Sequence, residues 1–554
     1  MPVLISVAML ASCSPKAVKL VAGGTDQKLR DRPAGTPQTS PQKPPILVLA
    51  LDGVSRDLLY DMIHAGELPH VAELLGGDEH AYYDHSFLST MPSTTMDAWV
   101  AAMTGRPPAD TGVAGNEYFI RERRQFACPA TISFDDPDTT LSVYTDHYLD
   151  KLVEVPTVYE LMRNREPHIQ IWVAMNHLFR GADRMLLAKR TALVKAFEGF
   201  VSKEIDELNA KPSPALFETL DTAAVDVVID HLNKDPLPDV LTLYLSGTDL
   251  YTHQAAEGPD EARRMYLKQV VDTQIGRVVE VLRAKGRLDR EWVIVVADHG
   301  HTQVVHDKQH ALGVAGLDAG PPTLLRQAGF RIRPLKQNVD QSDPFSAVLA
   351  YGGATAYVYL ADRSTCPGPK DVCRWDQMPR YAEDVLPAAE AFYRANKDGT
   401  GYPGMKNTLD MVLVRRPRPY AEIDRPFEVY VGGGKTEPLE DYLKEHPHPT
   451  YIDTVERLHD LAVGVHGERA GDIMLLARFG EVDKPEDRYY FAHLYRSWHG
   501  SPSRADSEIP LIVANHEHRT DEIGRYVKHV LGTRPFLQKL TDLMMGLRAS
   551  DLGQ

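Results

Sequence analysis

The sequence predicts an α/β protein in which helices cover both faces of a mainly parallel central sheet. Two observations carry this prediction. Continuous apolar runs, which are typical of strands buried on both faces, recur along the chain. Stretches with helical periodicity separate these runs, and such alternation favours an α/β sandwich. With 554 residues, the chain is long enough for one large α/β domain with insertions or for two domains.

Five apolar runs predict the strands: 46–51, 169–175, 240–245, 292–297 and 509–514. Three of the runs lead into an aspartate: Asp52 and Asp298 follow their runs directly, and Asp249 comes shortly after its run. In open α/β folds the functional site forms outside the carboxyl ends of the strands. We therefore expect these three carboxylates to meet at one edge of the sheet.

The segment 91–105 predicts a helix that starts after a run of three hydroxyl residues. Apolar residues in it recur at helical spacing, and the closing Gly105 supplies a stop signal. Ser93, Thr94 and Thr95 therefore fall at the helix start, where a hydroxyl can accept a backbone N–H and the helix dipole favours anions. Taken alone, this stretch predicts a helix cap, which we expect Ser93 or Thr94 to provide.

The rest of the chain contains both segments with a helical pattern and a long segment without a regular pattern. The stretches 262–284 and 521–547 also predict helices. The stretch 313–488 is less regular and has many Pro and Gly residues, so it predicts an insertion or cap region over the sheet. The α/β core is then expected to comprise 46–312 and 489–554.

Residues 1–45 predict a signal segment followed by a tether. An apolar run within 1–13, too short to span a bilayer, ends in the letters LASC, of which the last is Cys13. This ending resembles the lipobox of bacterial lipoproteins, although no Lys or Arg precedes the run. The resemblance implies lipidation of Cys13 and a place in the bacterial periplasm or at the cell surface. Residues 14–45 are rich in Pro, Gly, Ser and charge and predict a flexible tether.

Apart from Cys13, the chain has three cysteines, and their state is open at the level of sequence. Cys366 and Cys373 enclose a short loop and can form a disulfide bond in an oxidising compartment. In that case Cys128 has no cysteine partner. In the alternative, all three are free thiols. The spacing of these residues does not distinguish the two states.

Composition and charge exclude some classes of function. The contents of 43% hydrophobic and 25% charged residues are ordinary for a globular protein. The formal net charge of −16 argues against non-specific nucleic-acid binding, and no run of Lys and Arg with interleaved aromatic residues counters it. No apolar run after the first segment is long enough for a transmembrane helix, so we expect membrane contact only through a lipid at Cys13. A local positive pocket for an anionic substrate is compatible with this charge.

Six residues form a candidate metal-binding set: Asp52, Asp249, His253, Asp298, His299 and His499. Asp249 and His253 are four residues apart, which places both on one face of a helical turn. Asp298 and His299 are adjacent at the end of a predicted strand. His499 comes before the last predicted strand, 509–514. Carboxylates and imidazoles in this ratio suit Zn²⁺, and two such ions would clamp the attacking and leaving oxygens of a phosphoryl transfer.

The order of these residues resembles the alkaline phosphatase superfamily. An Asp ends the first strand, and a hydroxyl residue at a helix start, Asp-x-x-x-His, Asp-His-Gly and a late His-Gly follow in that order. More narrowly, the pattern is similar to the nucleotide pyrophosphatase/phosphodiesterase branch and to the related single-threonine alkaline phosphatases. The resemblance covers most of 46–515, with the middle only loosely matched. It implies an alkaline-phosphatase-like α/β/α sandwich that hydrolyses phosphoric esters.

The resemblance also implies two sites for zinc or another divalent metal. The implied ligands are Asp249, His253 and His499 at one site, and Asp52, Asp298, His299 and the oxygen of the nucleophile at the other. His466 is a rival for the third position of the first site because it, too, is followed by Gly. We prefer His499, which a core strand follows. His301 and His310 are interpreted as structural histidines.

The same resemblance selects Thr95 as the nucleophile. The family pattern runs from a hydroxyl at the helix start to Thr-Gly at the helix end and then to an Asn, which is Asn116 here. The resemblance implies that Thr95 also ligates zinc, and that its backbone N–H and the Asn116 amide bind the phosphoryl oxygens. Met96 and Asp97 depart from the usual Thr-Phe-Pro-Asn of the phosphodiesterases. We expect this departure to alter the pocket wall and to influence the choice of substrate.

The substrate class remains between alternatives. Single-threonine monoesterases grip the extra phosphate charge with Lys-x-Arg, and the nearest match here has Ala182 and Arg184. Arg184 is a candidate substrate-binding residue, or else a surface arginine, and the missing Lys favours diesters or pyrophosphates. The leading hypothesis is therefore a two-zinc phosphodiesterase or nucleotide pyrophosphatase with a covalent phospho-threonine at Thr95. The alternatives are a phosphomonoesterase with the same machinery and a non-catalytic lipoprotein on this scaffold.

Overall fold

The computed structural model describes residues 26–29, 43–134, 136–188, 214–313, 320–417 and 426–549. Cys13, and with it the expected lipid attachment, lies outside these residues, as does most of the tether expected at 14–45. Within the described ranges, no helix combines the length and the hydropathy that crossing a bilayer requires.

The larger of two main sheets has eight strands in the order β1-β7-β6-β8-β2-β9-β18-β3. The five strands from β7 to β9 are parallel to their neighbours, whereas β1, β18 and β3 pair antiparallel. The strands are β1 (Asp26–Lys28), β2 (Ile46–Leu51), β3 (Ala81–Asp84), β6 (Ile171–Ala174), β7 (Arg184–Leu186), β8 (Val240–Leu245), β9 (Trp292–Ala297) and β18 (Leu511–Ala514). The prediction of an α/β fold with a mainly parallel central sheet is confirmed.

Helices cover both faces of this sheet, because successive side chains of a strand point to opposite sides. On one face, Leu241 of β8 lines a small cavity together with Leu232 of α11. On the other face, the Tyr244 ring of β8 packs against the Trp99 ring of α5. The helices around the sheet are α3 (Arg56–His64), α4 (Pro69–Leu75), α5 (Thr95–Thr104), α9 (Val158–Arg165), α11 (Pro214–Lys234), α12 (Gly247–Thr252), α13 (Pro259–Tyr266), α14 (Asp272–Ala284), α20 (Thr520–Leu531) and α21 (Lys539–Ala549).

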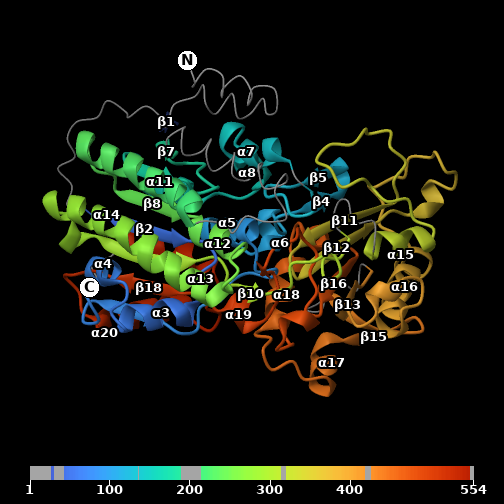
Figure 1. Ribbon diagram of the computed structural model, residues 1–554. Helices are drawn as coiled ribbons and strands as arrows, with labels where there is room; N and C mark the ends of the chain where they lie inside the picture. The colour runs from blue at the N-terminus through green and yellow to red at the C-terminus, as the bar shows by residue number, and fades with distance from the viewer. Residues whose placement is uncertain are drawn as a thin grey trace, which may run out of the picture.

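The second main sheet lies within 313–488, the region expected as an insertion or cap. It has six antiparallel strands in the order β11-β12-β16-β13-β14-β15. Figure 1 shows the two sheets at opposite ends of the molecule, with α5, α12 and β10 (Thr302–Gln303) between them in this view. The elements of this region are β11 (Ala347–Gly352), β12 (Thr355–Leu360), β13 (Leu409–Arg415), β14 (Phe427–Gly432), β15 (Lys435–Pro438), β16 (Ile473–Ala477), α15 (Pro321–Gln327), α16 (Leu386–Asp398), α17 (Leu439–Glu445) and α18 (Thr454–Ala462).

Short elements join these parts. A two-stranded ribbon pairs β10 with β17 (Ser497–Trp498), and a second ribbon pairs β4 (Tyr118–Ile120) with β5 (Gln125–Ala127). The first ribbon brings the segment after β9 next to the segment that leads into β18. The remaining short α-helices of the described residues are α6 (Pro108–Thr111), α7 (Pro137–Thr145), α8 (Tyr148–Leu152) and α19 (Arg504–Ser507).

Three element predictions need correction. Part of the expected tether is a strand, since Asp26–Lys28 pairs with β7 as β1 and so covers the open hydrogen-bonding edge of that strand. The predicted strand at 509–514 is present but antiparallel to β9. The helix expected at 521–547 is divided into α20 and α21.

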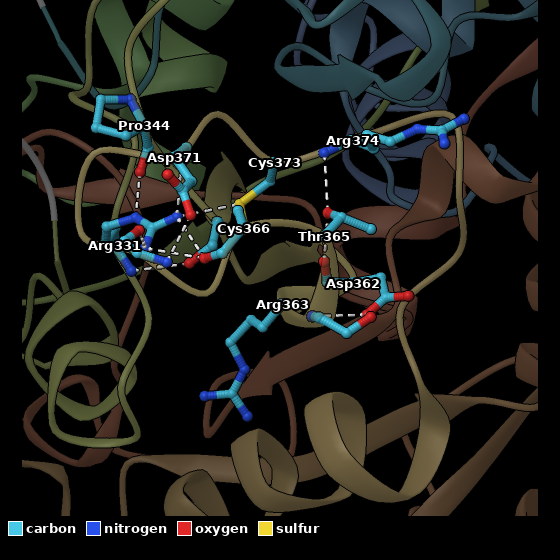
Figure 2. The surroundings of a disulfide bond; sticks show 12 residues. Arg331, Pro344, Asp362, Arg363, Thr365, Cys366, Asp371, Cys373 and Arg374 are labelled. Atoms are coloured by element: carbon cyan, nitrogen blue, oxygen red, sulfur yellow. Dashed lines mark hydrogen bonds between the residues drawn. A yellow bond between two sulfur atoms is a disulfide. The ribbon is translucent and has the colours of Figure 1, made fainter.

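Cys366 and Cys373 form a disulfide bond with a Cα–Cα distance of 4.7 Å, while Cys128 is a buried free thiol. The Arg331 guanidinium points into the loop that this bond closes (Figure 2). Its Nη1 donates to the Gly368 carbonyl at 2.9 Å and its Nη2 to the Asp371 carbonyl at 3.0 Å. Closing a loop of this size stabilises the native state by about 2 kcal/mol through the unfolded chain. The bond and the arginine together fix the conformation of 366–373.

Candidate metal centre and active site

Strand register brings the three predicted aspartates to one edge of the larger sheet. Leu51, the last residue of β2, pairs with Leu245 of β8 and with Ala297 of β9. Asp52 and Asp298 therefore leave neighbouring strands at the same level. Asp249 follows on the first turn of α12, which starts two residues after β8 ends.

Asp52, Asp298 and His299 turn one ligand atom each toward a common point, and these atoms lie within 4.8 Å of one another. His299 Nε2 is 3.4 Å from Asp52 Oδ1 and 3.6 Å from Asp298 Oδ2. Both of these carboxylate oxygens are buried and have no hydrogen-bond partner among the described residues. Two unpaired buried carboxylate oxygens are costly unless a cation lies between them. The residues of this group therefore fit a divalent metal.

The remaining polar atoms of this group are held by neighbours that fix its geometry. Asp52 Oδ2 accepts the hydroxyl of Tyr244. Asp298 Oδ1 accepts the backbone N–H of Gly53 at 3.1 Å. Since a carbonyl only accepts, His299 Nδ1 donates to the Gly300 carbonyl at 3.0 Å, which leaves the Nε2 lone pair for a metal.

Burial and mutual repulsion dominate the electrostatics of the carboxylates. Burial, followed by the charges of Asp298 and Asp249, raises the pKa of Asp52 well above its usual value. Burial also raises the pKa of Asp298. For Asp249, burial acts in the same direction, but His253 and His301 outweigh it and hold its pKa well below the usual range. A divalent cation would favour the ionised form of all three carboxylates.

Asp249 is shared between two further groups of potential ligands. With His253 and His301 it forms one group, and with His299 and His499 it forms the other, each within 4.8 Å. His253 Nε2 is 3.3 Å from Asp249 Oδ1. His253 Nδ1 donates to the Ser497 carbonyl at 2.7 Å and His499 Nδ1 to that of Ser93 at 2.8 Å, so both Nε2 atoms are available to a metal.

His301, which the sequence analysis treated as structural, is part of this centre. Its Nε2 lies 2.8 Å from Asp249 Oδ1 and its Nδ1 lies 3.2 Å from Ser497 Oγ. Burial lowers the pKa of His301 to about 3, so the ring is neutral near pH 7. The missed signal was the spacing of His299 and His301, because residues two apart in an extended segment share a face.

The other histidines that the sequence analysis weighed lie outside the three groups. His310 Nδ1 is 2.8 Å from Asp307, and its Nε2 is 3.1 Å from the Glu486 carbonyl. His466, the rival of His499, has its Nε2 3.4 Å from Glu154.

Thr95 is the first residue of α5, and its hydroxyl faces the first group of ligands. Thr95 Oγ1 lies 3.2 Å from His299 Nε2, the atom that also faces Asp52 and Asp298. Asn116 is buried, and its Oδ1 accepts the Met96 N–H at 2.9 Å. Its NH₂ group is therefore the part of the amide left to donate to a ligand.

The hydroxyls before Thr95 do not cap the helix as expected. Thr94 occupies the cap position, but its hydroxyl donates to Asp97 instead of accepting a backbone N–H. The Ser93 hydroxyl donates to the Ser501 carbonyl at 2.7 Å. Met96 and Asp97, expected in the pocket wall, are 3% and 0% exposed. The Asp97 carboxylate accepts the hydroxyls of Thr90 and Thr94, so this side chain is engaged by the loop before the helix.

Arg184, the expected phosphate-binding cation, is engaged elsewhere. Its Nη1 lies 2.8 Å from Asp235 Oδ2, and its guanidinium stacks over the Trp172 ring at 5.2 Å from the centroid. Arg184 is also the first residue of a strand parallel to β6, which places it at the amino end of the sheet. Asp52 lies at the opposite, carboxyl end. Arg184 therefore does not reach the centre.

The fold is similar to solved structures of ectonucleotide pyrophosphatase / phosphodiesterase 5. The murine protein, in an inactive form in complex with AMP, is 15% identical over 92% of this chain and 95% of that chain, with a TM-score of 0.48. The human protein is 13% identical over 91% of this chain and 95% of that chain, also with a TM-score of 0.48.

A family model described as type I phosphodiesterase / nucleotide pyrophosphatase matches residues 46–358. This match covers more than half of the chain and contains five of the six predicted metal ligands, Thr95 and Asn116. The family is metal-dependent, in agreement with the three groups of potential ligands. The chain therefore belongs to the type I phosphodiesterase / nucleotide pyrophosphatase family of the alkaline phosphatase superfamily and is a hydrolase of phosphoric ester bonds.

Proposed function

We propose that this chain is a two-zinc phosphodiesterase or nucleotide pyrophosphatase that forms a covalent phospho-threonine at Thr95. One observation carries the proposal: two buried carboxylate oxygens without partners, on Asp52 and Asp298, converge beside the Thr95 hydroxyl. Family membership supports hydrolysis of a phosphodiester or pyrophosphate bond.

In this proposal the potential ligands divide into two sets. Asp52, Asp298, His299 and Thr95 Oγ1 would hold one zinc. Asp249, His253 and His499 would hold the other. When bound, the pair supplies a lowered pKa at a coordinated oxygen and neutralises charge on the phosphoryl group.

The residues of the chain perform the remaining steps. Thr95 Oγ1 gives its proton to solvent and attacks phosphorus. The bond from phosphorus to the leaving oxygen breaks in line with the attack, and this oxygen takes up a proton from solvent. The Thr95 N–H at the start of α5 and the Asn116 amide donate to the phosphoryl oxygens. Water then attacks phosphorus and releases Thr95. Each of these donors is held in place before substrate arrives. It can therefore stabilise the transition state without the reorientation that water molecules would need.

Diesters are the preferred substrate class in this proposal. The side chain expected to meet a dianionic monoester, Arg184, is held by Asp235 at the other end of the sheet. The donors assigned to the phosphoryl group, Thr95 N–H and the Asn116 amide, are neutral. A second negative charge on the substrate would therefore gain little from these donors.

Comparison of two chromogenic esters tests this preference. We expect kcat/KM for bis-p-nitrophenyl phosphate to exceed that for p-nitrophenyl phosphate by about tenfold or more, and a chelator to suppress both reactions. Faster turnover of p-nitrophenyl phosphate would support the monoesterase alternative instead. Absence of chelator-sensitive turnover of either ester would support the non-catalytic alternative.

We also propose that Cys13 carries a lipid anchor in the bacterial periplasm or at the cell surface. The segment ending at Cys13 supports this, and the Cys366–Cys373 disulfide supports an oxidising compartment. In bacterial cells the full chain is expected to sediment with membranes and to incorporate labelled palmitate. Cys13→Ala should abolish the label, while Cys128→Ala should retain it. Label that persists in Cys13→Ala contradicts the proposal.

A further inference from the structure

The loop 89–94 that precedes Thr95 is tied to the segments that carry the metal ligands. The Ser89 hydroxyl donates to the backbone carbonyl of Asp298. The Ser93 carbonyl accepts from His499 Nδ1 at 2.8 Å. The loop is therefore fixed to ligand segments from both parts of the centre.

Asp97 joins the two ends of this loop from inside the helix. Its side chain is 0% exposed, on the first turn of α5. Asp97 Oδ2 accepts the Thr90 hydroxyl at 2.8 Å, and Asp97 Oδ1 accepts the hydroxyl of Thr94. Both oxygens of one carboxylate thus hold the loop.

Thr90 is also held from its other side. Arg457 of α18 is 1% exposed, and its Nη2 donates to the Thr90 carbonyl at 2.5 Å. Its Nη1 donates to the Pro502 carbonyl at 3.4 Å. Asp97 therefore binds the side chain of Thr90, while Arg457 binds its main chain.

The contacts that hold the loop also determine which backbone N–H groups at the start of α5 have hydrogen-bond partners. The Thr94 N–H donates to the Pro92 carbonyl at 3.0 Å and the Met96 N–H to Asn116 at 2.9 Å. Among the described residues, the Thr95 N–H has no partner. The same residue thus presents a hydroxyl that faces His299 Nε2 and an N–H without a partner among the described residues.

We propose that Asp97 is a positioning residue for the reaction at Thr95. By accepting the hydroxyls of Thr90 and Thr94, it fixes the loop so that Thr95 Oγ1 and the Thr95 N–H face the same phosphoryl group. This inference rests on the proposed function, since it requires Thr95 to be the nucleophile. Misplacing a reacting atom by about 1 Å costs about 10²-fold in rate, which sets the expected effect.

Four variants and a matched control test this role. Asp97→Ala is expected to lower kcat for bis-p-nitrophenyl phosphate by about 10-fold to 10²-fold, with KM changed less than about 2-fold and zinc content unchanged. Asp97→Asn, whose amide can still accept one hydroxyl, should lose less. Thr90→Val/Thr94→Val should reproduce most of the loss, and adding Asp97→Ala to it should cause little further loss.

Asp272→Ala is the matched control. Asp272 is also buried at 4% exposure, and its Oδ1 accepts the N–H groups of His70 and Val71 at the start of α4, both at 2.9 Å. Melting of the metal-free proteins should show that both alanine variants lose stability, whereas kcat should fall only in Asp97→Ala. An unchanged kcat in Asp97→Ala, an equal fall in Asp272→Ala, or additive losses with the threonine variants would each overturn the inference.

Thr95→Ala separates this inference from the proposed function. If Thr95→Ala is inactive while Asp97→Ala is fully active, only the positioning role fails. If Thr95→Ala retains activity, the proposed nucleophile is wrong and the positioning role fails with it.

Discussion

Thr95→Ala is expected to lower kcat/KM for bis-p-nitrophenyl phosphate by about 10³-fold or more. The Thr95 hydroxyl lies 3.2 Å from His299 Nε2, beside the unpartnered oxygens of Asp52 and Asp298. The substitution removes the atom that attacks phosphorus and leaves the backbone of α5 in place. Steady-state kinetics at matched zinc content measures the effect.

Thr95→Ser is the matched variant, because it keeps a hydroxyl at the same position. It should retain clearly measurable turnover. Acid quenching during turnover of labelled bis-p-nitrophenyl phosphate should trap a p-nitrophenylphosphoryl group on Thr95 in the unmodified protein and none in Thr95→Ala. Turnover by Thr95→Ala equal to that of the unmodified protein would rule out the covalent route.

Removal of divalent metal is expected to reduce hydrolysis to background, and zinc to restore it. Without a cation, Asp52 Oδ1 and Asp298 Oδ2 stay buried and unpaired, and the phosphoryl group meets no positive charge from this group. The metal-free protein should also melt at a lower temperature, because the preformed ligand set exists only in the folded state. Dialysis against a chelator, followed by titration with zinc, measures both effects.

Metal content of variants locates the ions. Asp298→Asn should bind about one zinc per chain fewer than the unmodified protein, which should hold about two. His310→Gln is the control, because His310 is buried at 7% exposure yet binds Asp307 outside the three ligand groups. Less than about one zinc per chain in gently purified protein would contradict the two-metal proposal.

The sequence predicted the core of the fold because buried parallel strands carry a simple signal. The apolar runs ending at Leu51 and Ala297 form neighbouring strands in register, and this register alone brings Asp52 and Asp298 together. The adjacency of Asp298 and His299 then gives most of one ligand group. Local patterns sufficed here because each ligand directly follows its strand.

Other features depend on contacts that local patterns do not contain. Arg184 has a side chain of the type that binds phosphate, but only the direction of β7 reveals that it lies at the amino end of the sheet. Asp97 looked like part of a pocket wall, and only the packing of α5 reveals that it faces Thr90 and Thr94. His301 was overlooked because its partner Asp249 lies on another element. The second sheet, built from antiparallel strands within an irregular region, carried no comparable signal.

The order of strands in the larger sheet has a consequence for biosynthesis. Strand β3 reaches the rest of the sheet only by way of β18, which pairs Ala81 with Ala514. The residues of β3 are synthesised long before those of β18. The β3 edge of the sheet therefore cannot form until β18, and with it the preceding segment that carries His499, has been synthesised. Under the proposed function, the set of potential metal ligands, which includes His499, is likewise incomplete until most of the described chain has been synthesised.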